Sequence, residues 1–289
     1  MRLFTPLFTL LLALPLSAHA WDRCSESREL TRQLPAAGLQ LLDLTARAGD
    51  LRIEGSARED IRLSARLCSN EKEALARMDV TDARDGDTLR ISVQIPWDED
   101  DFDPRYAYIG LSLQVPQQLL IDLRDSSGDI DIRSAAVRHL QDSSGDIELE
   151  DGRSDLTLLD TSGEIRIKRH RGSVTITDSS GDMHGEDIQG EVRVLSDSSG
   201  DIDFRKISGA VTIDRDSSGD IELREVARVH IGSDSSGNID VRHARGDVEI
   251  DEDSSGNIEV TKVAGNFRVG RKGQGSIRSD DVAGEISVP

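Results

Sequence analysis

The sequence predicts an all-β fold of one kind, a β-solenoid. This is a single-chain β-helix, expected to be right-handed, with coils of about 18–19 residues. Two observations support the prediction. The tetrapeptide Asp-Ser-Ser-Gly, once written Asp-Thr-Ser-Gly, recurs at intervals of 17 to 19 residues, and apolar residues alternate with polar ones between the copies. The eight copies end at Gly128, Gly145, Gly163, Gly181, Gly200, Gly219, Gly237 and Gly256, and a degenerate ninth copy is Gly273-Gln274-Gly275.

One period, residues 200–218, shows how each coil is built. Its segments 201–204 and 211–213 alternate between polar and apolar residues, and the Asp, Ser and Gly residues between periods are typical of turns. A third, weaker strand is expected around Ile207. Five apolar residues of this coil are expected to face inward: Ile202, Phe204, Ile207, Val211 and Ile213.

Such a coil cannot bury its own apolar residues, so the coils must stack and share one core. Helices do not fit an alternation with a period of two residues. A β-propeller blade needs about 40 residues per repeat, roughly twice the period seen here. Parallel coils stacked about 4.8 Å apart are the arrangement that fits best.

A less regular region, residues 21–115, precedes the repeats. We expect it to form an N-terminal β module that is fused to, or continuous with, the solenoid of residues 116–289. Its segment 48–55 resembles the core of one repeat, and one short helix is expected over 71–78. Further strands are expected over 61–67, 89–95 and 111–115, and a strand expected over 119–123, already in the solenoid region, leads into the repeats.

The last repeat changes character in the segment 270–275. There Arg271 and Lys272 replace the acidic residues of the turn. A solenoid must cover its open ends to avoid edge-to-edge pairing. We therefore expect this segment to form a C-terminal cap, and the alternative is a basic patch that binds a ligand.

Residues 1–20 have the layout of a signal peptide, with a positive start, an apolar run and the sequence Ala18-His19-Ala20 before Trp21. No later stretch is apolar enough to span a bilayer. We therefore expect an exported protein that resides in the periplasm, at the cell surface or outside the cell. In such a compartment Cys24 and Cys68 are expected to form a disulfide, and the alternative is two partly buried free thiols.

The charge of the chain excludes two kinds of partner. Its formal net charge is −20 and its pI is about 4.7. Nucleic-acid binding depends on Lys and Arg side chains that neutralise phosphates, and binding to anionic lipid has the same requirement. We therefore expect neither a nucleic acid nor an anionic membrane surface as partner.

Several features together resemble a known family. They are the export signal, a divergent Gly-Asp-Leu-Arg-Ile coil at 49–53, a Val-Pro lead-in at 115–116 and the many Ser-Gly-Asp-Ile coils. The combination is similar to the exported bacterial repeat proteins known as "putative adhesins", and the closing segment 275–289 is similar to that family's last repeat. The resemblance covers about residues 39–289. It implies a β-solenoid of the cell envelope without assigned catalysis, and it supplies no catalytic residues.

Acidic residues flank the turn glycines in coil after coil. Asp and Ser side chains can accept hydrogen bonds from turn amides, which is the structural explanation, whereas stacked carboxylates could also bind Ca²⁺. The usual calcium-binding rolls have two Gly-rich turns per coil, and this sequence has only one. The possible calcium ligands are Asp125, Asp129, Asp142, Asp146, Asp178, Asp182, Asp197, Asp201, Asp216 and Asp220.

The segment 97–108 combines aromatic and acidic residues. Aromatic rings can stack on sugar faces while carboxylates accept hydrogen bonds from hydroxyl groups, so this loop could bind a carbohydrate. The alternative is a loop that packs over the end of the solenoid with a solvated acidic tip. The residues concerned are Trp97, Asp100, Phe102, Tyr106 and Tyr108.

No catalytic residue is predicted. The sequence lacks a Gly-x-Ser-x-Gly elbow, a His-Glu-x-x-His motif and a phosphate loop, and no pair of carboxylates is distinguished from the many others. We expect a non-enzymatic structural or adhesin-like interaction module without a cofactor, whose partner is an envelope protein or a glycan. Two alternatives are a carbohydrate-binding or polysaccharide-active β-helix that uses the 97–108 loop, and a calcium-stabilised surface repeat protein.

Overall fold

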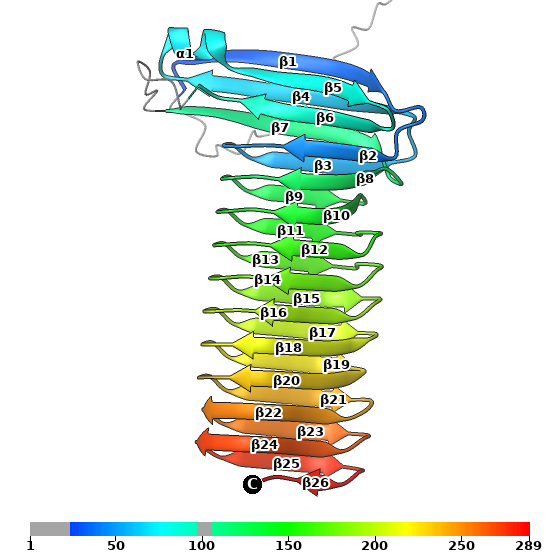
Figure 1. The fold of residues 1–289 in the computed structure, drawn as a ribbon, viewed down its shortest axis with the longest axis vertical. Coiled ribbons are helices and arrows are strands. Elements are labelled where there is room, and N and C mark those ends of the chain that lie inside the picture. The colour runs from blue at the N-terminus through cyan, green and yellow to red at the C-terminus, as the bar shows by residue number, and fades with distance from the viewer. Residues whose placement is uncertain (1–23, 97–105) are drawn as a thin grey trace, which may run out of the picture.

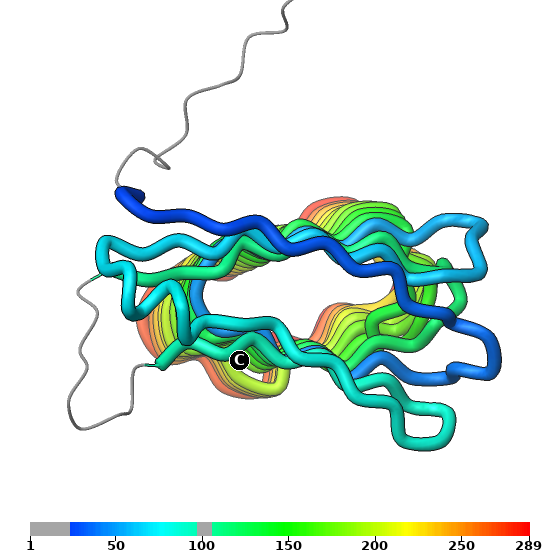
Figure 2. The backbone as a smooth tube through the Cα atoms, turned by 90° about the horizontal axis from the view of Figure 1, so that it is seen from above, coloured from blue at the N-terminus to red at the C-terminus, as the bar shows by residue number. Residues whose placement is uncertain are grey.

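The computed structural model describes residues 24–96 and 106–289, which form two long β-sheets that face each other (Figure 1). Each sheet contains thirteen strands. Viewed along the rod, the sheets are the long sides of a flattened loop that the chain follows once per coil (Figure 2). The predicted all-β solenoid is therefore confirmed, and the hand of the coil stays a prediction.

The strands of the two sheets alternate along the repeats. Sheet A contains, in spatial order, β1 (Glu26–Pro35), β4 (Asp60–Ser69), β7 (Ala107–Pro116), β3 (Leu51–Ser56), β9 (Ile130–Arg133), β11 (Ile147–Glu150), β13 (Ile165–Lys168), β15 (Met183–Ile188), β17 (Ile202–Ile207), β19 (Ile221–Val226), β21 (Ile239–Ala244), β23 (Ile258–Val263) and β25 (Ile277–Val282). Sheet B contains β5 (Asp79–Asp85), β6 (Thr88–Gln94), β2 (Leu41–Thr45), β8 (Leu120–Arg124), β10 (Ala136–Gln141), β12 (Leu156–Leu159), β14 (Val174–Thr177), β16 (Val192–Ser196), β18 (Ala210–Asp216), β20 (Arg228–Asp234), β22 (Val248–Ser255), β24 (Phe267–Gln274) and β26 (Ile286–Ser287).

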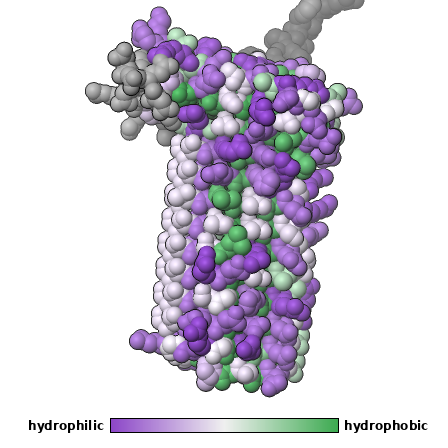
Figure 3. Space-filling view, viewed as in Figure 1, coloured by the Kyte–Doolittle hydropathy of each residue, from purple (hydrophilic) through white to green (hydrophobic). Residues whose placement is uncertain are grey.

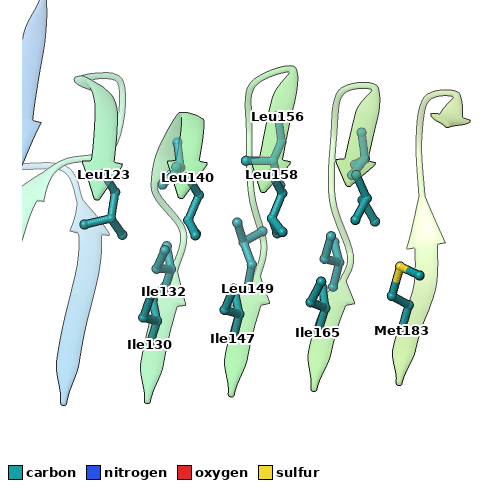
Figure 4. Packing of buried hydrophobic residues seen from close by; sticks show 14 of the residues in the cluster. Leu123, Ile130, Ile132, Leu140, Ile147, Leu149, Leu156, Leu158, Ile165 and Met183 are labelled. Carbon is teal, nitrogen blue, oxygen red and sulfur yellow. The ribbon is translucent and has the colours of Figure 1, made fainter. Parts of the chain in front are cut away.

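Nine coils follow one another from β8–β9 to β24–β25, each with one strand in sheet B and the next in sheet A. Neighbouring coils are parallel and in register, so that Ile147 pairs with Ile165, which pairs with Met183. Inward side chains of both sheets, such as Leu149 and Leu158, meet in one core (Figure 4). Stacking thus buries the apolar residues that one coil alone would expose.

The coil of residues 200–218 confirms the inward positions and corrects one detail. All five residues predicted to face inward are at most 1% exposed. The expected third strand is not formed, because Ile207 is the last residue of β17 and the coil has two strands. Lys206 has a left-handed φ of 57°, which turns the chain so that Ile207 points back to the core after two exposed residues. This left-handed residue recurs once per coil from Ser134 to Asp281.

The region before the repeats is built on a first coil, β2–β3. After β3 the chain forms β4, the helix α1 (Lys72–Arg77), β5, β6 and β7. β6 then pairs in parallel with β2, and β7 with β3. The remaining pairings are antiparallel: β1 pairs with β4, β4 with β7, and β5 with β6. Antiparallel strands therefore form the N-terminal end of both sheets. Both sheets run without a break from this region into the repeats.

A disulfide joins Cys24, just before β1, to Cys68 near the end of β4, with a Cα–Cα distance of 5.7 Å. It holds the outermost strand of sheet A to its neighbour. Among the described residues, α1 is the only α-helix, and none there is long and apolar enough to cross a membrane. The predicted signal peptide, residues 1–20, lies outside the described residues.

The segment 270–275 does not cover the end of the rod. Its first five residues belong to β24, and the strands β25 and β26 follow it. The two basic residues separate: the Arg271 side chain is 76% exposed, whereas the Lys272 side chain is 6% exposed and points into the rod. The inward Lys272 pairs with Asp253.

Candidate functional site

The Asp-Ser-Ser-Gly turns lie one above another along one edge of the rod, where strands of sheet B lead into strands of sheet A. This edge is the pale column of intermediate hydropathy in Figure 3. At Gly219 the φ angle is +131°, and a Cβ atom there would lie 1.9 Å from the carbonyl oxygen of Gly200. The turn glycines therefore let the backbones of successive coils approach each other directly.

The Asp that begins each turn points into the rod, and we call these eight residues the interior aspartate column. Oδ1 of Asp178 accepts hydrogen bonds from the backbone N–H groups of Ser179 and Ser180, at 2.7 and 3.4 Å. Each member of the column is at most 6% exposed. The members are Asp125, Asp142, Asp160, Asp178, Asp197, Asp216, Asp234 and Asp253.

Burial raises the pKa of these carboxyls, because the charged form loses its hydration. The pKa rises to about 7 for Asp125 and Asp216 and to about 6 for Asp142, Asp178 and Asp234. At several members the charge of a neighbouring column residue raises the pKa further, while the turn N–H donors oppose the rise. The second oxygen, Oδ2, accepts no hydrogen bond within the described part of the chain at Asp160, Asp178, Asp197 and Asp234.

Lys272 closes the C-terminal end of the interior aspartate column. It is in register with Asp253, and its Nζ lies 3.2 Å from Oδ2 of that residue. The ammonium group opposes the effect of burial on Asp253, whose pKa still lies above its usual value. At the other end Ala46, directly after β2, takes the place that Asp125 takes after β8. The column therefore begins at an apolar residue and ends at a cation.

The residue after each turn glycine lies on the outside of the turn. We call the acidic members the outer acidic column. The N–H group of Asp146 donates to Oδ1 of Asp129 at 3.1 Å, and that of Asp220 donates to Oδ1 of Asp201 at 2.8 Å. These carboxylates accept backbone donors from the next coil and so fix the register of neighbouring coils. The column consists of Asp129, Asp146, Glu164, Asp182, Asp201 and Asp220, and Asn238 and Asn257 continue it.

The ten residues predicted as possible calcium ligands are divided between these two columns. Asp125 is buried, whereas Asp129 is exposed on the other side of the turn. Within the residues that the structure describes, no group of three or more His, Cys, Asp or Glu side chains is placed to hold a metal ion. The hydrogen bonds agree with turn capping, and calcium binding stays a prediction.

The predicted carbohydrate loop is only partly described. Trp97, Asp100 and Phe102 lie outside the described residues. The rings of Tyr106 and Tyr108 meet edge to face, with centroids 5.6 Å apart and an interplanar angle of 83°. Tyr108 is paired with Cys68 across β7 and β4, and burial raises the pKa of its phenol. The aromatic pair therefore lies beside the disulfide, at the N-terminal end of the rod.

A hollow of about 320 Å³, which no sequence pattern predicted, lies on the outer face of sheet A, and we call it the His184 hollow. Nε2 of His184 lies 3.2 Å from Oε1 of Glu164, and its Nδ1 lies 3.9 Å from Oδ2 of Asp203. Gly185, which interrupts the apolar pattern of β15, was the only sequence signal near it. The hollow is lined by Glu164, Arg166, Lys168, His184, Gly185, Glu186, Asp203 and Arg205.

The fold and the stacked turns define the class of protein: a two-sheet β-solenoid in which eight of the nine coils turn at Asp-Ser-Ser-Gly or, once, Asp-Thr-Ser-Gly. Residues 41–269 match the Toastrack DUF4097 family, a domain of unknown function, and the chain belongs to this family. No curated protein matches the chain by sequence.

Solved structures of similar proteins share little sequence with this chain. A "putative cell adhesion protein" from Clostridium sporogenes is 11% identical, with 91% of this chain and 99% of that chain covered and a TM-score of 0.27. A "putative lipid binding protein" from Parabacteroides distasonis is 17% identical, with coverages of 89% and 96% and a TM-score of 0.40. A "putative adhesin" from the same organism is 12% identical, with coverages of 91% and 97% and a TM-score of 0.36.

Proposed function

We propose that this protein is a non-enzymatic interaction rod of the bacterial cell envelope, which residues 1–20 direct out of the cytoplasm. The observation that supports this most is the continuity of the two sheets over all nine coils. A stack of coils that share one core presents long, regular outer faces, which is how solenoid proteins bind their partners.

The outer faces carry charge in a repeated arrangement. On sheet A, Arg224 pairs with Glu222 and Arg242 pairs with Asp240 in successive coils. Ion pairs that remain partly open to the solvent add little to stability, so they can change without loss of the fold. A partner with complementary charge, either an envelope protein or a glycan, could therefore contact several coils at once.

Fractionation of cells that express the tagged full chain tests the export half of the proposal. We expect the full chain outside the cytoplasm, with the disulfide formed, and a chain without residues 2–20 in the cytoplasm. Co-sedimentation of the mature chain with isolated envelope fragments tests binding, with the fragments omitted as control. A full chain that stays in the cytoplasm would contradict export. A mature chain that never sediments with the fragments would contradict the interaction.

A second candidate function is carbohydrate binding at the N-terminal end. The edge-to-face pair of Tyr106 and Tyr108 favours it, because these two aromatic rings directly follow a segment of the sequence that is rich in carboxylates. A glycan array and a polysaccharide depolymerisation assay test it. We expect no turnover. Turnover that disappears in Asp100→Asn would overturn the non-enzymatic proposal, and glycan binding lost in Tyr106→Ala alone would favour the second candidate.

A further inference from the structure

The interior aspartate column is acidic although turn capping does not require a charge there. An Asn side chain could accept the same N–H hydrogen bonds. Eight carboxyls nevertheless lie in one line between the sheets, each at most 6% exposed. We propose that this column is a proton-binding site. The folded rod holds protons there that the unfolded chain has released at neutral pH, so the rod becomes more stable as the pH falls from about 8 to about 5.

Repulsion along the column favours proton uptake. Register places neighbouring members one coil apart, which is about 4.8 Å in a parallel sheet. Two full negative charges at this distance repel strongly where water is excluded. Asp216 lies between Asp197 and Asp234, and after burial itself these two neighbours contribute most to the rise of its pKa. A proton on one member relieves the repulsion on both sides.

A bound proton also supplies a donor that the column lacks. Oδ2 of Asp178 and Oδ2 of Asp197 are buried and accept no hydrogen bond within the described chain. A protonated carboxyl carries an O–H group that can donate to a carboxylate of the neighbouring coil. The proton comes from water, and the only covalent change is the formation of this O–H bond.

The charged groups around the column favour protonation except at one end. Lys272 is the cation that acts on the column, where it opposes the rise of the pKa of Asp253 and Asp234. We therefore expect the protons on the N-terminal and central members. Carboxylates on the outer side of the turns also raise the pKa of the nearest interior members. These outer carboxylates are Asp50, Asp129, Asp146 and Asp182.

The direction of the pH effect on stability follows from the number of protons that the folded and the unfolded chain bind. An Asp with an unshifted pKa titrates near 3.8, whereas five members of the column titrate at about 6 to 7 in the fold. Between these values the folded chain binds more protons than the unfolded chain, so the free energy of unfolding rises as the pH falls. Four carboxyls that pair with Arg or Lys have lowered pKa values: Asp60, Asp122, Asp151 and Glu186. The stability that these ion pairs contribute is lost only at still lower pH.

Thermal melting of the mature chain at pH 5.0, 6.0 and 7.5, at constant ionic strength, tests the proposal. We expect the melting temperature at pH 5.0 to exceed that at pH 7.5 by about 5 °C or more. Asp216→Asn is neutral at every pH, so it should raise the melting temperature at pH 7.5 and reduce the pH dependence. The control is Asp201→Asn in the outer acidic column, which removes the same charge from the surface and should leave the pH dependence intact.

Infrared spectroscopy of the wild-type chain at pH 6.0 gives a second readout that needs no variant. We expect the band of neutral carboxyl groups in the folded protein and its loss on unfolding at the same pH. The proposal is overturned if the melting temperature is equal or lower at pH 5.0 and the band is missing. It is also overturned if Asp216→Asn and Asp201→Asn change the pH dependence equally. If Asp216→Asn does not fold, Asp142→Asn replaces it.

Discussion

Phe204 fills a space that Gly185 leaves in the neighbouring coil, and this pair gives a packing prediction with a defined size. The two residues are in register across β15 and β17, and the Phe204 side chain is 1% exposed. A Cβ atom on Gly185 would lie 2.7 Å from Cδ1 of Phe204 and 3.2 Å from Cδ1 of Ile188. Gly185→Ala therefore overpacks the core, which costs about 1–3 kcal/mol, partly offset by about 0.5–1 kcal/mol from the lower backbone entropy of Ala in the unfolded chain.

Removing the ring should remove the clash. Phe204→Leu alone should cost about 1–2 kcal/mol, since it leaves part of the ring's space empty. In the double variant the added methyl group of Gly185→Ala occupies that space. We expect the double variant to be more stable than the sum of the single effects predicts, by about 1–2 kcal/mol.

Urea denaturation followed by circular dichroism measures the four members of this cycle. Agreement between calorimetric and van't Hoff enthalpies must be checked first, because repeat proteins can unfold in parts. Leu223→Val provides the control: Leu223 pairs with Phe204 on its other side, one coil farther from Gly185. Its combination with Gly185→Ala should be additive. A cycle at Gly185 and Phe204 that is also additive would refute the packing argument.

Three further predictions concern the N-terminal end and the turns. Reduction of the disulfide, or Cys24→Ser, should destabilise the N-terminal strands by about 4 kcal/mol, because the disulfide closes a loop between residues 44 positions apart. Thermal melting with and without reductant checks this prediction. The melting temperature of Cys24→Ser itself should not respond to reductant. Gly219→Ala should lower the free energy of unfolding by about 3 kcal/mol or more, since it combines a positive φ with a clash against the backbone of Gly200. Gly86→Ala is the control: Gly86 has a φ of +63°, but a Cβ atom there would meet nothing within 4 Å. It should cost about 1 kcal/mol in the same urea denaturation assay. A calcium chelator should leave the melting temperature unchanged if N–H donors alone cap the turns, and a drop of many degrees would show that Ca²⁺ binds there.

The repeat predicted the coils because period and burial are both local properties. The alternation around Ile202 and Val211 determines which side chains face inward, and the turn glycines determine where each coil closes. The arrangement of residues 57–119 could not be predicted in the same way. Its strands pair with partners far away in sequence, such as β4 with β1 and β7 with β3, and no local pattern specifies such partners.

The candidate site shows the same limit at the level of single side chains. The sequence placed Asp178 and Asp182 in the turns, but it did not show that one would be buried and the other exposed. That difference depends on the left-handed glycine between them, Gly181, which reverses the chain within a few residues. Lys272 was expected in a cap because it is basic, and its burial follows only from its register with Asp253.

The two acidic columns stabilise the turns in different ways, and both leave the outward faces of the strands available for binding. The outer acidic column links coil to coil through backbone N–H groups, and four members of the interior aspartate column accept hydrogen bonds from turn amides: Asp160, Asp178, Asp197 and Asp234. Neither column lies on the outward faces of the strands, where Arg224 and Glu222 are half-buried and reach the solvent. Because stability arises in the core and the turns, outward residues can change freely. A fold of this kind can therefore present different outer faces to different partners while it keeps one core and one set of turns.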